Sequence, residues 1–114
     1  MPRRDVSMTD DEVDDFLAGC AQLVVGAIDG EGWPTGTIAA SAYHDGALTL
    51  RGLPDEMLDL MARDARICCV ADEHAAYYEI RGVIVHATAA RRPESQDVAA
   101  TLDHVISFDF GRLR

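Results

Sequence analysis

Apolar residues in the first half of the chain form runs of strand length separated by turn signals. Three such runs lie between Ala21 and Arg51, divided by the turn sequences Asp29–Gly32 and His44–Gly46. Glycine reaches the positive φ that tight turns need, and aspartate hydrogen-bonds its own backbone there. The pattern predicts three antiparallel strands joined as a meander. The first run, Leu23 to Ile28, is apolar on both alternating faces, which predicts cover on both sides, as in a barrel wall.

The second run of this meander is rich in small residues. From Thr35 to Ala42 it reads Thr-Gly-Thr-Ile-Ala-Ala-Ser-Ala. Small side chains on a sheet leave room for another body to lie against the backbone. That body is a ligand, another subunit or a bulky neighbouring side chain, and the pattern alone leaves the three open.

Two segments combine helical periodicity with helix start signals. Thr9 and Glu12 form a capping box, and the apolar residues after them recur at helical spacing as far as Cys20. Pro54, followed by acidic residues, marks the start of a second helix. The predicted buried face of this second helix consists of Met57, Leu58 and Met61.

The second half of the chain predicts three more strands and a short helix. A two-sided apolar strand covers Ile67 to Ala71, and a long strand covers Tyr77 to Arg91 with a bulge or bend at Gly82. Helical spacing from Pro93 to about Asp103 predicts a short helix, and alternation from Ile106 to Phe110 predicts a half-buried strand. The whole order predicts a mostly β protein, a small antiparallel barrel with peripheral helices.

The composition is typical of one globular domain. The chain has 114 residues, of which 48% are hydrophobic, enough for one core and outside the disordered range. We expect residues 1–8 to form a flexible tail and residues 9–114 to form the domain. No apolar run approaches the roughly 18 residues of a membrane span, and no secretory segment follows the N-terminus. These features predict a cytoplasmic protein with no membrane partner.

The charge excludes several classes of function. The net charge is −10, and all ten basic residues are arginines. An acidic surface repels nucleic-acid phosphates, so a DNA or RNA partner is not expected. Because the chain has no lysine, Schiff-base chemistry and a P-loop are excluded.

Cysteine and histidine positions do not indicate a metal site. Cys68 and Cys69 are adjacent in a strand-like run, so their side chains point to opposite faces. Together with Cys20 they form an odd set typical of a reducing compartment, and we expect buried structural thiols. The four histidines lack metal-ligand spacing. Neither Ser41 nor Ser107 lies in a GxSxG motif, so a hydrolase is not expected.

Six short phrases, in their order and spacing, resemble the FMN-binding split barrel. They are Phe16-Leu17-Ala18, Asp29-Gly30-Glu31-Gly32-Trp33-Pro34, Asp45-Gly46-Ala47-Leu48, Leu60-Met61-Ala62-Arg63-Asp64-Ala65-Arg66-Ile67, Tyr78-Glu79-Ile80-Arg81-Gly82-Val83 and Ser107-Phe108-Asp109-Phe110. This is the fold of pyridoxamine 5′-phosphate oxidase and its small relatives, which include deazaflavin F420-dependent reductases. The resemblance covers most of residues 9–110.

The resemblance implies a homodimer with two equivalent cofactor sites at the subunit interface. In such proteins the flavin ring lies against the second strand, and the phosphate is held at the end of the third strand and in the loop that follows. The positions that match the ring-binding strand are Thr37, Ile38, Ala39 and Ala40. The positions that match the phosphate site are Thr49, Leu50, Arg51 and the loop Gly52 to Met57.

The phosphate loop departs from the family pattern. Flavin-binding members commonly carry a Ser-Arg-Lys-like cluster where this chain has Pro54, Asp55 and Glu56. A carboxylate about 4 Å from a phosphate charge repels it by roughly 4 kcal/mol near a protein surface. Two interpretations of Arg51 and Arg66 stay open. They compensate through bidentate contacts with the phosphate, or they form structural ion pairs with neighbouring acids, of which the candidates are Asp55, Glu56 and Asp64.

Two functions are therefore expected. The first is a flavin-dependent oxidoreductase that uses FMN, with F420 as the alternative cofactor, on an unidentified small molecule. In such enzymes the cofactor performs the redox chemistry, so the absence of a catalytic triad is uninformative. The second is a cofactor-free split-barrel homodimer that serves as a binding module.

Overall fold

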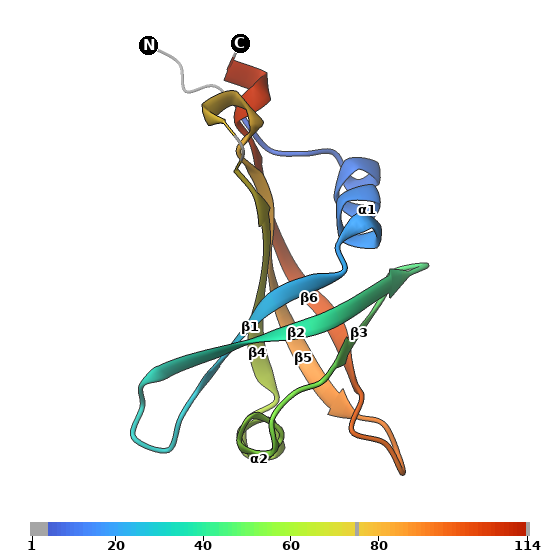
Figure 1. Ribbon diagram of the computed structural model, residues 1–114, viewed down its shortest axis with the longest axis vertical. Coiled ribbons are helices and arrows are strands. Elements are labelled where there is room, and N and C mark those ends of the chain that lie inside the picture. The colour runs from blue at the N-terminus through green and yellow to red at the C-terminus, as the bar shows by residue number, and fades with distance from the viewer. Residues whose placement is uncertain (1–4, 75, 114) are drawn as a thin grey trace.

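Six antiparallel strands close into a barrel in the order β1-β2-β3-β6-β5-β4 (Figure 1). The computed structural model describes residues 5–74 and 76–113, without the side chain of Tyr78. The strands are β1 (Gln22–Ile28), β2 (Pro34–His44), β3 (Ala47–Arg51), β4 (Arg66–Glu73), β5 (Arg81–Arg91) and β6 (Val98–Asp109). This confirms the predicted meander and the mostly β, antiparallel barrel with peripheral helices.

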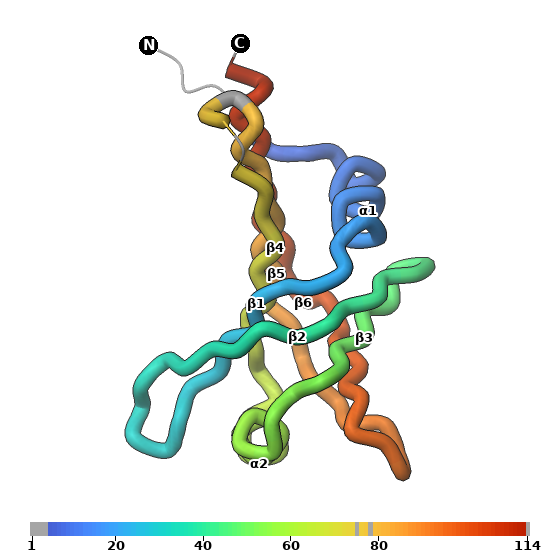
Figure 2. Tube along the Cα trace, viewed as in Figure 1, coloured from blue at the N-terminus to red at the C-terminus, as the bar shows by residue number. Residues whose placement is uncertain are grey.

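Two α-helices lie outside the barrel wall. Helix α1 (Asp10–Gly19) packs against β2 and β5, and α2 (Asp55–Arg63) packs against β1 and β5. Two short 3-10 turns, η1 (Tyr77–Glu79) and η2 (Phe110–Leu113), lie together at the end of the barrel opposite α2 (Figure 2). Among the described residues, no helix combines the length and apolar character that crossing a membrane requires.

The local start signals act as the sequence predicts. The Glu12 amide donates to Thr9 Oγ1 at 3.2 Å, and the Thr9 amide donates to Glu12 Oε1 at 3.1 Å, which completes the capping box. In α2, Pro54 is the N-cap residue and not the predicted first helical residue, so the helix begins one position later, at Asp55. The buried residues of α2 are Met57, Leu58 and Met61, as predicted.

The core fills the interior of the barrel with one alternating face of each strand. The largest fully buried side chains are Leu17, Leu48, Leu50, Val25, Val83, Val85, Val98 and Cys69. On β1, the inward face is buried while Val24 and Ile28 on the outward face are 45% and 52% exposed. The second apolar face of β1 therefore has no cover within the described chain.

The strand predicted over Tyr77–Arg91 begins later than expected. Residues Tyr77–Glu79 form η1, and β5 begins at Arg81. Gly82 is not a bulge. It is a point of close approach, because a Cβ there would lie 2.6 Å from Phe108 Cζ and 2.8 Å from the Ala71 carbonyl oxygen. The irregular pairing of β5 lies instead between His86 and Ala87.

The helix predicted from Pro93 to Asp103 is wrong. A hairpin turn follows β5, in which the Arg92 amide donates to the Asp97 carbonyl at 3.0 Å and Glu94 has a φ of +56°. Residues from Val98 onward form β6, which continues through the predicted half-buried strand to Asp109. Alanine favours helices locally, but pairing of this segment with both β3 and β5 satisfies the backbone along the facing edges of those two strands and closes the barrel.

Part of the predicted tail lies along β6. The Asp109 amide donates to the Val6 carbonyl at 2.7 Å, and the Met8 amide donates to Ser107 Oγ at 2.9 Å. Residues 1–4 of the predicted tail are outside the described residues.

Candidate functional site

The ring-binding positions predicted on β2 divide between the two faces of the strand. Ala39 points into the barrel and is 1% exposed, and Thr37 lies on the same inward face. Ile38 and Ala40 point outward, and Ile38 is 61% exposed. A ligand outside the barrel would therefore meet the side chains of Ile38 and Ala40 and only the backbone of their neighbours.

The phosphate-site positions on β3 divide in the same way. Leu50 is fully buried in the core, so its side chain is unavailable to a ligand. Thr49 and Arg51 point outward, and the strand register pairs Ala42 with Thr49 and Ala40 with Arg51. Five outward residues thus form one continuous surface, which we call the β2–β3 platform: Ile38, Ala40, Ala42, Thr49 and Arg51.

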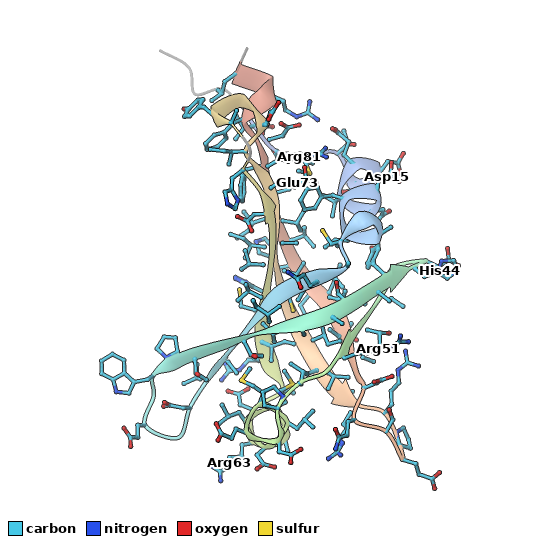
Figure 3. The ribbon with its side chains drawn as sticks, viewed as in Figure 1. Asp15, His44, Arg51, Arg63, Glu73 and Arg81 are labelled. Carbon is cyan, nitrogen blue, oxygen red and sulfur yellow. The ribbon has the colours of Figure 1, made fainter. Side chains whose placement is uncertain are left out.

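One end of this platform carries two guanidinium groups. Arg92 Nη2 donates to Thr49 Oγ1 at 3.1 Å, and Arg51 Nε lies 3.5 Å from Asp97 Oδ2. Thr49 is the only polar or charged residue that is buried among the described residues, with 9% of its surface exposed. Figure 3 shows Arg51 on β3, on the side of the barrel where β6 begins. The long Arg92 side chain can reach across the sheet because small Ala99 lies between, as the register partner of Thr49.

Sequence reasoning missed Arg92 and Asp97. Both belong to the β5–β6 hairpin, which the predicted helix concealed. The available signal was a pair of arginines directly before Pro93, a residue that commonly ends a strand.

Arg66 lies away from the other predicted phosphate residues. It begins β4, which the closed strand order places on the opposite side of the barrel from β3. Its guanidinium binds Asp64 in two places, with Nη2 to Oδ2 at 2.8 Å and Nε to Oδ1 at 3.0 Å. These hydrogen bonds hold the pKa of Asp64 at about 2. Of the two interpretations of Arg66, the structure has the ion pair, whereas the partner of Arg51 is Asp97 and none of the predicted acids.

Asp55 and Glu56 occupy the first turn of α2, and both are exposed. Acids suit this position because the helix dipole is positive there. Their charge also follows Arg51 closely in the chain, so it disfavours an anionic ligand there.

Five aliphatic side chains line up across the outside of the barrel. The register joins Ile38 on β2 to Val24 on β1, and continues through Val70, Ile84 and Ile106 on β4, β5 and β6. We call these five residues the aliphatic row. Ile38, Val24 and Ile106 are 61%, 45% and 42% exposed. Soluble proteins seldom leave contiguous apolar surface of this kind uncovered.

A cavity of about 460 Å³ opens beside the aliphatic row, among β1, β4 and β5. Its lining is mainly apolar and includes Gly26, Ile28, Pro34, Arg66, Cys68 and His86. The sequence did not predict it, because its walls come from segments far apart in the chain.

The predicted burial of the thiols is found for one of the three cysteines, and the predicted opposite orientation of Cys68 and Cys69 is confirmed. Cys69 is fully buried, and burial raises the pKa of its thiol to about 12. Cys68 points the other way and is half-buried, as is Cys20. All three are free thiols. His86 and His104 pair across β5 and β6, with ring centroids 5.7 Å apart, but within residues 5–74 and 76–113 no three histidine, cysteine or acidic side chains are grouped to hold a metal.

Several solved structures share this architecture. Conserved hypothetical protein Rv2991 from Mycobacterium tuberculosis superimposes with a TM-score of 0.84 at 19% identity, covering 99% of this chain and 92% of that one. An FAD-binding protein from Mesorhizobium loti gives a TM-score of 0.76 at 14% identity, covering 89% of this chain and 92% of its own. A protein of the pyridoxinephosphate oxidase family from Clostridium acetobutylicum gives 0.67 at 12% identity, covering 91% and 96%.

Two comparisons based on sequence found no match. No protein-family profile matches the chain, and no curated protein matches it. The identities to the solved structures are low enough that they establish the fold and not the ligand. The chain therefore has the split-barrel fold of the pyridoxamine 5′-phosphate oxidase-like proteins, as its sequence phrases indicated.

Proposed function

We propose that this protein binds a flavin-type cofactor on the β2–β3 platform and acts as an oxidoreductase on a small organic molecule. FMN is the proposed cofactor, with deazaflavin F420 as the alternative. One observation carries the proposal: an exposed strip of small side chains on β2 leads directly to Arg51 and Thr49 on β3. The flavin-binding protein of the same fold from Mesorhizobium loti supports it.

The platform matches the two chemical parts of such a cofactor. A planar ring requires a flat surface, which Ala40 and Ala42 supply together with the backbone of β2. A terminal phosphate requires cations and hydroxyl groups, which Arg51 and Thr49 supply. The bound flavin would provide the redox chemistry, while the residues of this chain bind and orient it.

We also propose that the protein is a homodimer joined through the aliphatic row. A stable interface buries about 1,200–2,000 Å² in total, and the row crosses five of the six strands. It begins at Ile38, which also belongs to the platform. A second copy on the row would therefore lie next to the ring and help to exclude water from it. The free cysteines support a cytoplasmic location, because disulfides persist mainly in oxidising compartments.

The cofactor proposal is tested by the visible spectrum of the purified protein, followed by separate titrations with FMN and F420. We expect saturable binding of one of them, with quenching of its fluorescence as the ring leaves water. The absence of a bound chromophore and of saturable binding to either cofactor would refute the proposal.

A second candidate function is a cofactor-free binding module with the same fold. The observation that favours it is the exposed pair Asp55 and Glu56 beside the platform, in a protein of net charge −10. If the carboxylates are what exclude a flavin, Asp55→Arg combined with Glu56→Lys creates FMN binding where the unaltered protein has none. Submicromolar FMN binding by the unaltered protein contradicts this candidate.

A further inference from the structure

We propose that Arg92 is a second anion-binding residue of the β2–β3 platform, and that Asp97 is the internal counter-charge that a ligand phosphate displaces. The identification of that phosphate as part of a flavin rests on the proposed function. The anion site itself rests on the geometry of the β5–β6 hairpin.

Arg51 and Arg92 lie at the same end of the platform, where Arg51 contacts Asp97 and Arg92 contacts Thr49. Thr49 and Arg51 are two residues apart on the same face of β3, so their Cβ atoms are separated by about 7 Å. Arg92 reaches that face from the hairpin and places Nη2 3.1 Å from Thr49 Oγ1. An anion above Thr49 therefore lies within reach of both guanidinium groups and of the hydroxyl.

The hairpin fixes the backbone from which Arg92 and Asp97 extend. The Arg92 amide donates to the Asp97 carbonyl at 3.0 Å, and the Asp97 amide donates to Ser95 Oγ at 3.0 Å. Neighbouring Arg91 is engaged elsewhere, since its Nε donates to the Ser95 carbonyl at 3.0 Å. Of the two adjacent arginines, only Arg92 is therefore directed to the platform.

The Arg51–Asp97 ion pair is long and exposed, so a ligand anion can take the place of Asp97 at Arg51. Its Nε–Oδ2 distance is 3.5 Å, and the two side chains are 61% and 36% exposed. The Arg66–Asp64 pair on the far side of the barrel is closer, at 2.8 Å, and is held by two hydrogen bonds. A phosphate, with more charge and more acceptor oxygens than one carboxylate, competes well for a guanidinium that is so loosely paired.

This arrangement offsets the acidic loop. Asp55 and Glu56 follow Arg51 closely in the chain, and both are exposed in the first turn of α2. Arg92 adds a second guanidinium group at Thr49, and the Asp97 carboxylate at the same end of the platform is the charge that a bound anion would replace.

The test compares FMN, riboflavin and inorganic pyrophosphate by isothermal titration against the wild type and four variants. Riboflavin has the same ring as FMN without the phosphate. The variants are Arg92→Gln, Arg51→Gln, Asp97→Asn and the hairpin control Arg91→Gln. Thermal midpoints of all variants show whether the hairpin stays folded.

We expect Arg92→Gln and Arg51→Gln each to weaken FMN binding about ten- to a hundredfold and to leave riboflavin binding unchanged. Asp97→Asn should strengthen FMN binding several-fold, because the ligand no longer displaces a carboxylate. Arg91→Gln should resemble the wild type. Added salt should reduce the differences in FMN affinity between the wild type and these variants, since screening weakens exposed charge contacts.

The inference is overturned if Arg92→Gln binds FMN and pyrophosphate as the wild type does, or if Asp97→Asn weakens their binding. If neither flavin binds but pyrophosphate binds and depends on Arg92, the flavin proposal fails and the anion site stands. If pyrophosphate and FMN both fail to bind, the anion site is refuted as well.

Discussion

The aliphatic row makes a quantitative prediction about self-association. Val24 lies near its centre and is 45% exposed in the single chain. Complete burial of such a side chain contributes about 1.5–3 kcal/mol, so covering the exposed part contributes about 0.7–1.4 kcal/mol in each copy. A twofold interface counts the residue twice. Val24→Asp should therefore raise the dimer dissociation constant by at least about 10- to 100-fold, and burying the new carboxylate raises it further.

The assay is sedimentation velocity across a micromolar concentration series, with Thr101→Asp as the matched control. Thr101 is an exposed position within β6, outside the row, so its variant carries the same added charge and a similar loss of strand propensity. We expect the control to sediment as the wild type does and Val24→Asp to shift toward monomer. A wild type that is monomeric throughout the series would refute the homodimer. A Val24→Asp variant that dimerises as well as the wild type would show that the row is not the interface.

Three further predictions concern the barrel itself. Gly82→Ala should lower the urea midpoint by an amount equivalent to about 1–3 kcal/mol, because the added Cβ meets Phe108 and a backbone carbonyl; an unchanged midpoint would contradict that close approach. The pKa of Asp64 is lowered from 3.8 to about 2 by its hydrogen bonds from Arg66, so its contribution to stability is present above pH 4 and is lost as the pH falls toward 2. The urea midpoint of Asp64→Asn should therefore be slightly below that of the wild type at pH 6 and equal to it near pH 2. A difference between the two midpoints that grows as the pH falls would contradict this prediction. Cys69, whose buried thiol has a pKa of about 12, should react with Ellman's reagent at pH 8 only after unfolding. Rapid reaction of all three cysteine thiols in the native protein would contradict the burial of Cys69.

Local signals in the sequence determined much of the fold. The capping box at Thr9, the helix start at Pro54 and the turns of the first meander all form between residues within a few positions of one another. Their hydrogen bonds and φ angles depend on residue types in a fixed short order, so the sequence alone predicts them. The assignment of Leu50 to the phosphate site was wrong, because neighbouring residues of a strand point to opposite faces and Leu50 points into the core.

The error over residues 93–103 shows where local pattern stops being sufficient. Alanine-rich segments satisfy their backbone equally well as a helix or as a paired strand. The choice was made by β3 and β5, whose facing edges both required a partner in order to close the barrel. β3 lies far from β6 in the chain, and β5 pairs with β6 across a hairpin turn, so the pattern of residues 93–103 alone does not contain the deciding interactions.

The candidate site likewise depends partly on local sequence pattern and partly on strand pairing. The sequence placed small residues on β2 and a cation at the end of β3, because alternation along a strand is local. Only the closed strand order carried Arg66 to the opposite side of the barrel from Arg51. Only the hairpin brought Arg92 to Thr49, which is 43 positions earlier in the chain. Side chains that meet through strand pairing depend on which edges join, and that choice is made by the free energy of the whole barrel.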